Sequence, residues 1–420
     1  MILSILKETS ADETRVAATP ESVKKYIALG YAVQVEAGAG AAAAYTDSAY
    51  AESGAKICKT AGEALKGANA ILKVKAPSDK ELAAYPKNAL LFALLAPHGN
   101  HALAKSLAGA GITAFSMELV PRITRAQSMD VLSSQSNLAG YKAVLDAAAH
   151  FGRAFPMMMT AAGTISPAKV FVMGAGVAGL QAIATARRLG AIVTATDVRA
   201  AAKEQVESLG AKFIAHQDEE FKAAETAGGY AKEMSDAYKK KQAELVEGHI
   251  AGQDIVITTA LIPGRPAPKL VSEKMVKSMK PGSVIVDLAV EAGGNVEGSE
   301  AGKIVQKGGV TIIGHRNVPG RLATDASALY ARNIYNLIVL LSDKDKKTLS
   351  VPWDDDIVKA MALTAGGKIV HPMFDGAKAP AAKPAPKKVT VKKAPVKKTA
   401  TKKVPAKKPA GPKAKKGSKK

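Results

Sequence analysis

The stretch "KVFVMGAGVAGLQAIATARRLGAIVTATDVRA", residues 169–200, contains a complete strand–helix–strand unit in one run. Val170–Met173 has the continuous apolar pattern of a buried strand, and the helical pattern that follows it ends at Gly190. A second strand pattern then leads to Asp197. Between the first strand and the helix stand the glycines of a G-x-G-x-x-G spacing, Gly174, Gly176 and Gly179. Strand, triplet, helix, strand and carboxylate in this order are far more specific than a glycine triplet alone.

This order predicts a dinucleotide-binding site. The first glycine permits a tight turn, the second lets the backbone approach a pyrophosphate, and the third allows the helix to pack closely on the strand. Unpaired N–H groups at the helix start favour phosphate. Asp197 is placed to accept hydrogen bonds from an adenine-ribose 2′-hydroxyl and to repel a 2′-phosphate, so we expect NAD(H). Arg199, two residues later, leaves a 2′-phosphate open as the alternative.

The same alternation of strand and helix patterns extends along most of the chain and indicates parallel βαβ units. The roughly 375 residues before a basic tail exceed the usual size of one core. We therefore predict an α/β protein with two Rossmann-like domains that have parallel sheets and are joined by long helices at 133–155 and 323–341. Further strand patterns stand at residues 2–6, 31–36, 70–74, 89–95, 112–116, 254–260, 283–289 and 309–315. The expected limits are 1–132 with 320–375 for the first domain, 133–319 for the NAD(H)-binding domain and 376–420 for the tail.

Residues 376–420 carry most of the chain's net charge. They contain 17 Lys and no Asp or Glu, whereas the whole chain has 59 Lys and Arg against 37 Asp and Glu, a net of +22. Without them, 42 basic residues face 37 acidic ones, a net of +5. A Lys-, Pro- and Ala-rich segment buries too little surface to fold, so we expect a disordered tail. Three roles stay open for this tail: binding to an anionic membrane surface, binding to nucleic acid, or acting only as a solubilising linker with no target.

Cysteine content and hydropathy indicate a soluble chain in a reducing compartment. Cys58 is the only cysteine, so no internal disulfide is expected, and we interpret it as a small buried apolar residue. The N-terminal apolar run is too short for a signal peptide. No uncharged apolar stretch reaches the ~18 residues of a membrane-spanning helix.

A second candidate site is the polar segment "PRITRAQSMDVLSSQSN", residues 121–137. It offers two guanidinium groups, an amide, a carboxylate and several hydroxyls, which suit hydrogen bonds to a nicotinamide carboxamide and ribose. The alternative is an ordinary solvated loop in which Ser133 or Ser134 caps the following helix. An ion pair between Arg122 and Asp130 is expected to lock the loop.

Together, the two segments resemble the NAD(H)-binding component of proton-translocating NAD(P)+ transhydrogenases, a family related to the alanine dehydrogenases. The resemblance covers about residues 1–375, and the tail lies outside it. The motifs that carry it, in order, are "RAQSMDVLSSQSN", "RAFPMMMTAAGT", "GAGVAGLQAIATARRLGA", "ATDVRAA", "ETAGGYAKEM", "TTALIPGRPAP" and "VDLAVEAGGN".

The resemblance also assigns roles by position. The family's Arg-Gln-Asp loop, which orients the nicotinamide at the catalytic site, falls on Arg122, Gln127 and Asp130, and Ser133 completes its contacts. The phosphate loop falls on Ala175, Gly176 and Val177, and the ribose carboxylate on Asp197. The other cofactor contacts implied are Val198 and Arg199 beside the ribose, Leu261 on the adenine side, and Gly229, Tyr230 and Met234 in a mobile lid.

The function implied is hydride transfer between NAD(H) on this chain and NADP(H) on a partner. This reaction needs no nucleophile, acid, base or metal in the chain, only two nicotinamide rings held close together in a dry site. The resemblance further implies a homodimer, held at the inner face of the cytoplasmic membrane by membrane-spanning and NADP(H)-binding subunits that couple the reaction to proton translocation.

Two other functions stay open. An alanine dehydrogenase would place its substrate on Arg15 and Lys75 and use a catalytic His, but Leu94 stands where that His is expected, and Glu291 replaces an active-site Asp. His98 and His101 fall beyond that strand, and we expect no metal there, because two histidines are too few ligands. The basic tail leaves a nucleic-acid-binding protein as the other alternative.

Overall fold

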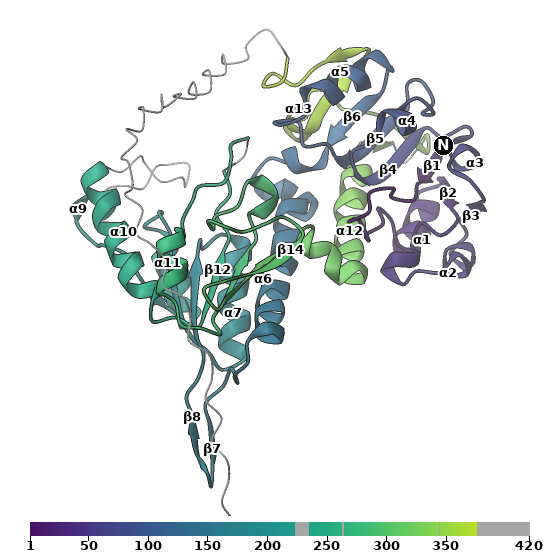
Figure 1. Cartoon of the computed structure of the whole chain (residues 1–420). Coiled ribbons are helices and arrows are strands. Elements are labelled where there is room, and N and C mark those ends of the chain that lie inside the picture. The colour runs from purple at the N-terminus through teal and green to yellow at the C-terminus, as the bar shows by residue number, and fades with distance from the viewer. Residues whose placement is uncertain (223–234, 263, 344, 376–420) are drawn as a thin grey trace, which may run out of the picture. The chain divides into compact units, whose positions relative to one another are not determined.

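The computed structural model describes residues 1–222, 235–262, 264–343 and 345–375, and Figure 1 shows its helices and strands. The tail at 376–420 and the predicted lid residues Gly229, Tyr230 and Met234 lie outside the described residues. None of the helices within the described ranges combines the length and apolar character needed to cross a membrane.

The first sheet has the order β19-β18-β6-β5-β4-β1-β2-β3 within the described residues. From β3 to β6 every pairing is parallel, and the order 3-2-1-4-5-6 is that of a Rossmann fold. At its other edge, β18 pairs antiparallel with β6 and with β19. The strands are β1 (Ile2–Ile5), β2 (Ala32–Glu36), β3 (Lys56–Cys58), β4 (Ala70–Lys75), β5 (Leu90–Leu94), β6 (Thr113–Ser116), β18 (Ala362–Ala365) and β19 (Lys368–Ile369).

The second sheet has the order β11-β10-β9-β12-β13-β15-β14, again within the described residues. Its first six strands are parallel and repeat the order 3-2-1-4-5-6, while β14 is antiparallel to β15. The prediction of two Rossmann-like folds is confirmed. The strands are β9 (Lys169–Met173), β10 (Ile192–Thr196), β11 (Lys212–Phe213), β12 (Ile255–Thr258), β13 (Val284–Asp287), β14 (Lys303–Lys307) and β15 (Val310–Gly314).

The helices are set between these strands. The α-helices are α1 (Pro20–Ala28), α2 (Asp47–Glu52), α3 (Ala61–Leu65), α4 (Asp79–Leu82), α5 (His101–Gly109), α6 (Val131–His150), α7 (Val177–Arg188), α8 (Ala202–Ser208), α9 (Glu219–Lys222), α10 (Asp236–Ile250), α11 (Glu273–Ser278), α12 (Ala323–Leu341) and α13 (Asp356–Met361). Short 3₁₀ helices are η1 (Ala41–Ala43), η2 (Met117–Leu119), η3 (Thr124–Met129), η4 (Val290–Ala292) and η5 (Val318–Leu322).

The two long helices differ in how well they match the prediction. The second, α12, spans 323–341 as predicted. The first, α6, begins two residues before Ser133 and ends at His150 instead of 155, because Asp130 caps it and Phe151 is already extended. The return of the chain to β18 in the first sheet supports the proposed assignment of residues 320–375 to the first domain.

Two small strand pairs were not expected. One is the antiparallel hairpin of β7 (Met158–Thr160) and β8 (Gly163–Ile165), whose residues are all exposed and which projects away from its neighbours in Figure 1. The other joins β16 (Ser342–Asp343) to β17 (Thr348–Leu349). The sequence of β7, Met-Met-Thr, lacks the alternation of apolar and polar residues that marks a strand with one buried face.

Helices α6 and α7 cross in very close contact and lie side by side in Figure 1. At the crossing, a Cβ added to Gly140 would lie 2.0 Å from the backbone oxygen of Ala178. No side chain other than hydrogen fits there. Around it, Ala143, Ala147 and Ala182 are buried in the core of the second sheet.

We expect Gly140→Ala to destabilise the chain by about 1–3 kcal/mol, because the obstructing atom is backbone and cannot rotate away. Gly248 in α10 is the matched control, since a Cβ there meets nothing within 4 Å. Gly248→Ala should stabilise by about 0.5–1 kcal/mol. Chemical denaturation of both variants tests this, and equal effects at the two positions would contradict the close crossing.

Candidate functional site

The strand order of the second sheet reverses between β9 and β12. In open α/β sheets, ligands bind at the carboxyl ends of the strands beside such a reversal. The residues after the two strands meet there: Thr259 donates its backbone N–H to the Met173 oxygen (2.9 Å) and its Oγ1 hydroxyl to the Gly174 oxygen (3.1 Å). This edge carries the glycine loop.

The three glycines of the loop meet three different steric requirements. Gly174 has φ +107°, in the region that favours glycine. A Cβ on Gly179 would lie 1.8 Å from the Gly174 oxygen, so the helix start packs directly on the turn. A Cβ on Gly176 would meet nothing within 4 Å, so the backbone there is open to an approaching group. No side chain of the described residues caps α7 at Gly176, which leaves the helix N–H groups directed at that space.

Asp197 and Arg199 enclose Ala175, the buried second residue of the loop. The Asp197 carboxylate accepts the Ala175 N–H (2.7 Å), while Arg199 donates from Nη2 to the Ala175 oxygen (3.1 Å). The same carboxylate accepts the Arg199 backbone N–H (2.8 Å), Nε (2.9 Å) and Nη2 (3.0 Å). Hydrogen bonding to Asp197 raises the pKa of Arg199, outweighing the opposite effect of its partial burial. Both groups are thus engaged within the chain.

The polar segment 121–137 folds as the short helix η3 followed directly by α6. Asp130 is the N-cap of α6: its carboxylate accepts the Ser133 N–H (2.9 Å) and the Ser133 hydroxyl (2.5 Å). The interpretation of Ser133 or Ser134 as the cap was therefore wrong. A carboxylate at the N-cap satisfies the same N–H groups and adds a favourable charge at the positive end of the helix.

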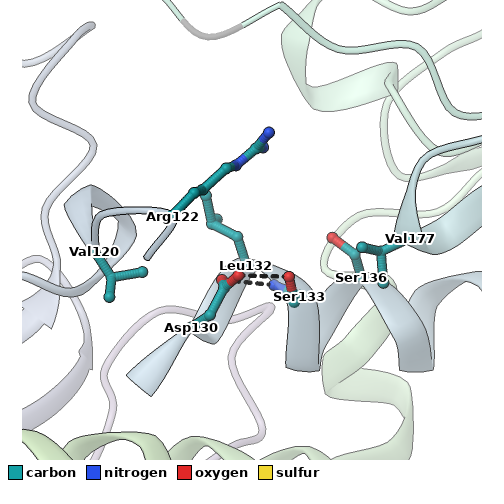
Figure 2. Close-up of a pocket in the computed structure, with 7 residues that line it drawn as sticks. All are labelled: Val120, Arg122, Asp130, Leu132, Ser133, Ser136 and Val177. Carbon is teal, nitrogen blue, oxygen red and sulfur yellow. Dashed lines mark hydrogen bonds between the residues drawn. The ribbon is translucent and has the colours of Figure 1, made fainter. Parts of the chain in front are cut away.

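A pocket joins this segment to the start of α7, and Figure 2 shows the side chains around it. Of the residues predicted from the sequence, it is lined by Arg122, Asp130, Ser133 and Val177; the lining residues Val120, Leu132 and Ser136 were not anticipated. Gln127 is exposed on η3 but does not line the pocket. Leu132 and Val177 are 48% and 40% exposed. Their partial exposure beside a carboxylate and a guanidinium gives the pocket both apolar and polar walls.

The expected ion pair between Arg122 and Asp130 is wrong. In Figure 2 the Arg122 side chain extends away from the Asp130 carboxylate, which is directed at Ser133. The carboxylate is held by the helix start, and the exposed guanidinium is left to other partners. Val198 (66% exposed) and Leu261 (57% exposed) are also accessible, whereas Gly229, Tyr230 and Met234 fall outside the described residues.

Arg15, one of the two residues that would serve an amino-acid substrate, is engaged elsewhere. Arg15 is buried and pairs with Glu13 through Nε (2.8 Å) and Nη2 (2.7 Å), while its Nη1 donates to Gln135 (2.8 Å). Leu94 lies in β5, where the catalytic His of an alanine dehydrogenase would be expected. No group of three His, Cys, Asp or Glu side chains that could hold a metal occurs in the described part of the chain. His98 and His101 instead pack their rings against Phe374 (5.0 and 6.0 Å between centroids).

Residues 143–372 match the family model described as "Alanine dehydrogenase/PNT, C-terminal domain", and residues 4–139 match "Alanine dehydrogenase/PNT, N-terminal domain". The chain is 57% identical to a protein of Rhodospirillum rubrum that is named as the first portion of NAD(P) transhydrogenase subunit alpha, over 90% of this chain and 99% of the relative. It is 30% identical to an alanine dehydrogenase of Methanococcus maripaludis, over 88% and 95% of the two chains. The solved structure of a transhydrogenase from Sinorhizobium meliloti superposes with a TM-score of 0.81 at 56% identity, covering 88% of this chain and 100% of the other.

We expect Asp130→Ala to destabilise the chain by about 1 kcal/mol, because α6 loses its N-cap. Asp130→Asn should stay within about 0.5 kcal/mol of the parent, because asparagine caps helices equally well. Chemical denaturation of the two variants measures the difference. If Asp130→Ala unfolds at the same denaturant concentration as Asp130→Asn, the carboxylate is not needed as a cap.

Proposed function

Because the chain belongs to the alanine dehydrogenase/PNT family, we propose that it is the NAD(H)-binding component of a proton-translocating NAD(P)+ transhydrogenase. In this proposal, hydride passes between NAD(H) on this chain and NADP(H) on a partner. The observation that carries it is the pocket in which Arg122, Asp130 and Ser133 face the first residue of α7, Val177. A dinucleotide carries a nicotinamide ring at one end and a pyrophosphate in the middle. Here a glycine loop that suits the pyrophosphate and a polar pocket that suits the ring both lie at the start of α7.

The glycine loop suits a pyrophosphate. The space beside Gly176, the close packing of Gly179 and the uncapped start of α7 together form a cradle that a Cβ at Gly176 would begin to fill. We propose that the backbone of 175–177 holds the phosphates and that Asp197 receives a ribose hydroxyl. Val198, Arg199 and Leu261 would contact the adenosine half.

The chain's part in catalysis is positioning. NAD(H), when bound, supplies the chemistry of hydride exchange. Arg122, Asp130 and Ser133 would orient the carboxamide, with Gln127 reaching from the adjacent η3, and the apolar side chains Val120, Leu132 and Val177 would keep water from the ring. Asp130 is already held by Ser133, so its oxygens keep one direction before any ligand arrives. Fixed hydrogen-bonding groups orient a ring with little further loss of entropy.

The pairing of Asp197 with Arg199 supports NAD(H) over NADP(H). A 2′-phosphate would have to displace the Arg199 guanidinium from a carboxylate to which it makes two hydrogen bonds, and would then lie beside that carboxylate's negative charge. The 2′-hydroxyl of NAD(H) would need only to donate a hydrogen bond to the Asp197 carboxylate, which could keep its bonds to Arg199.

An alanine dehydrogenase is the less favoured function. A substrate carboxylate needs a free guanidinium, and Arg15 is paired with Glu13 in a buried site. Reduction of an imine also needs a proton donor, and Leu94 supplies none. The much higher identity to a transhydrogenase subunit points the same way.

The assembly is also a proposal. The family implies a homodimer bound to membrane-spanning and NADP(H)-binding subunits at the cytoplasmic face of the membrane. The protruding β7–β8 hairpin, with the exposed side chains Met157, Met158, Met159 and Ile165, supports a contact with a second copy, which sedimentation of the purified chain tests.

Residues 376–420 lie outside the described residues; their 17 lysines favour an anionic membrane surface over nucleic acid, since no aromatic residue is interleaved for base stacking. Co-sedimentation with anionic vesicles at rising salt tests that target.

Purified chain is expected to bind NADH and to transfer hydride to NADP+ or its analogues only after an NADP(H)-binding transhydrogenase component is added. The reason is that the described residues offer one glycine-loop site and no second one. Alanine with NAD+ should give no reduction above the background without enzyme. Reduction of NAD+ by alanine with the chain alone would contradict the proposal and favour the dehydrogenase.

A further inference from the structure

We infer that Asn333 of α12 is a positioning residue that holds the nicotinamide-orienting segment in place. The inference rests on the proposed function of Asp130 and Ser133. It adds a residue that lies about 200 positions away in sequence and does not line the pocket.

Asn333 uses both ends of its amide on the segment that carries those two residues. Its Nδ2 donates to the backbone oxygen of Ser128 (2.8 Å), and its Oδ1 accepts the hydroxyl of Ser134 (2.8 Å). The orientation of the amide is determined, because a backbone carbonyl only accepts. Asn333 is 7% exposed, so water competes little for either bond.

The two contacts bracket the functional residues. Ser128 precedes Asp130 by two positions, and Ser134 follows Ser133 directly. The amide therefore spans the turn in which η3 ends and α6 begins, and fixes the distance between the two sides of the Asp130 cap. A shift of either side would move the carboxylate and the hydroxyl relative to Arg122 and Val177 in the pocket (Figure 2).

Other contacts hold the rest of η3, but those described below do not join Ser128 to Ser134 as Asn333 does. Ala126 and Met129 are buried in the core of the first sheet. Arg125 makes a bidentate pair with Asp355 (2.6 and 2.9 Å), but half of its side chain is exposed, which weakens such a pair. Asn336, one turn after Asn333, also donates to the Ser128 oxygen (2.9 Å) but has no contact with Ser134 among the described hydrogen bonds. Of these two asparagines, Asn333 is the one that joins both sides.

The substitution that isolates this role is Asn333→Asp, which keeps the shape and replaces the donor. As a carboxylate, the new side chain directs negative charge at the Ser128 carbonyl; once protonated, it again has a donor for that oxygen. We expect hydride transfer to fall about 10- to 100-fold at pH 8, as misplacement of orienting groups by about an ångström does. It should recover as the pH falls and the carboxyl protonates, whereas we expect no such recovery in the parent. The Kd for NADH should change less than about threefold, since the contacts to the phosphates and adenosine are untouched.

Asn336→Asp is the matched control, on the same helix and against the same carbonyl oxygen. It should slow transfer by no more than about threefold and recover little at low pH, because the more exposed carboxylate is screened by water and Asn333 still joins Ser128 to Ser134. Should Asn333→Asp unfold at the assay temperature, Ser134→Ala removes the other contact without adding charge, and a fall of about three- to tenfold in rate with unchanged NADH affinity is expected. Each variant is assayed as the full chain with a purified NADP(H)-binding transhydrogenase component.

The outcomes separate the alternatives. A rate of transfer in Asn333→Asp like that of the parent at every pH overturns the inference. The inference is also overturned if the rate falls together with the affinity for NADH and the denaturant concentration at the unfolding midpoint, because Asn333 would then serve folding only. If the parent itself binds NADH but never transfers hydride, the proposed function fails instead; the emission spectrum of bound NADH, which reports the surroundings of the ring, then shows whether Asn333→Asp moves the segment. An unchanged spectrum would refute positioning.

Discussion

The contact between α6 and α7 at Gly140 is the constraint on which the candidate site depends. The first residues of α6 follow Asp130 and include Ser133, and the first residues of α7 follow the glycine loop. Because Gly140 lies against the backbone of Ala178, the two helices approach as closely as backbones can. A larger residue at this crossing would separate the polar pocket from the glycine loop, which we propose to bind the two halves of one dinucleotide.

A second feature of the site is that its acidic groups are fixed before any ligand binds. Asp197 is hydrogen-bonded to the loop that it follows, and Asp130 to the helix that it caps. Their carboxylates are partly buried, where an unpaired charge is costly, so these bonds both stabilise the chain and direct the remaining oxygen lone pairs. This is the arrangement expected of a protein that orients a ring and leaves the chemistry to the cofactor.

The parts of the fold that depend on local pattern could be predicted from the sequence, whereas contacts set by tertiary geometry could not. The unit at 170–197 has its periodicity, turn glycines and carboxylate in one run, and the apolar pattern of 323–341 marks α12 throughout. The exposed β7–β8 hairpin left no signal that periodicity detects. Residue types alone favoured a pair between Arg122 and Asp130, but the helix start competes for the same carboxylate and prevails. Nothing near Asn333 in the sequence identifies its partners, although an asparagine within an apolar helix hints at a buried hydrogen bond.

The central claim is that the glycine loop and the polar segment bind one dinucleotide. Hydrogen–deuterium exchange of the full chain, with and without saturating NADH, tests it most directly. We expect slower exchange in both 174–180 and 124–134, with the matched control, ADP-ribose, slowing only the first. Protection by NADH confined to the glycine loop would contradict the claim.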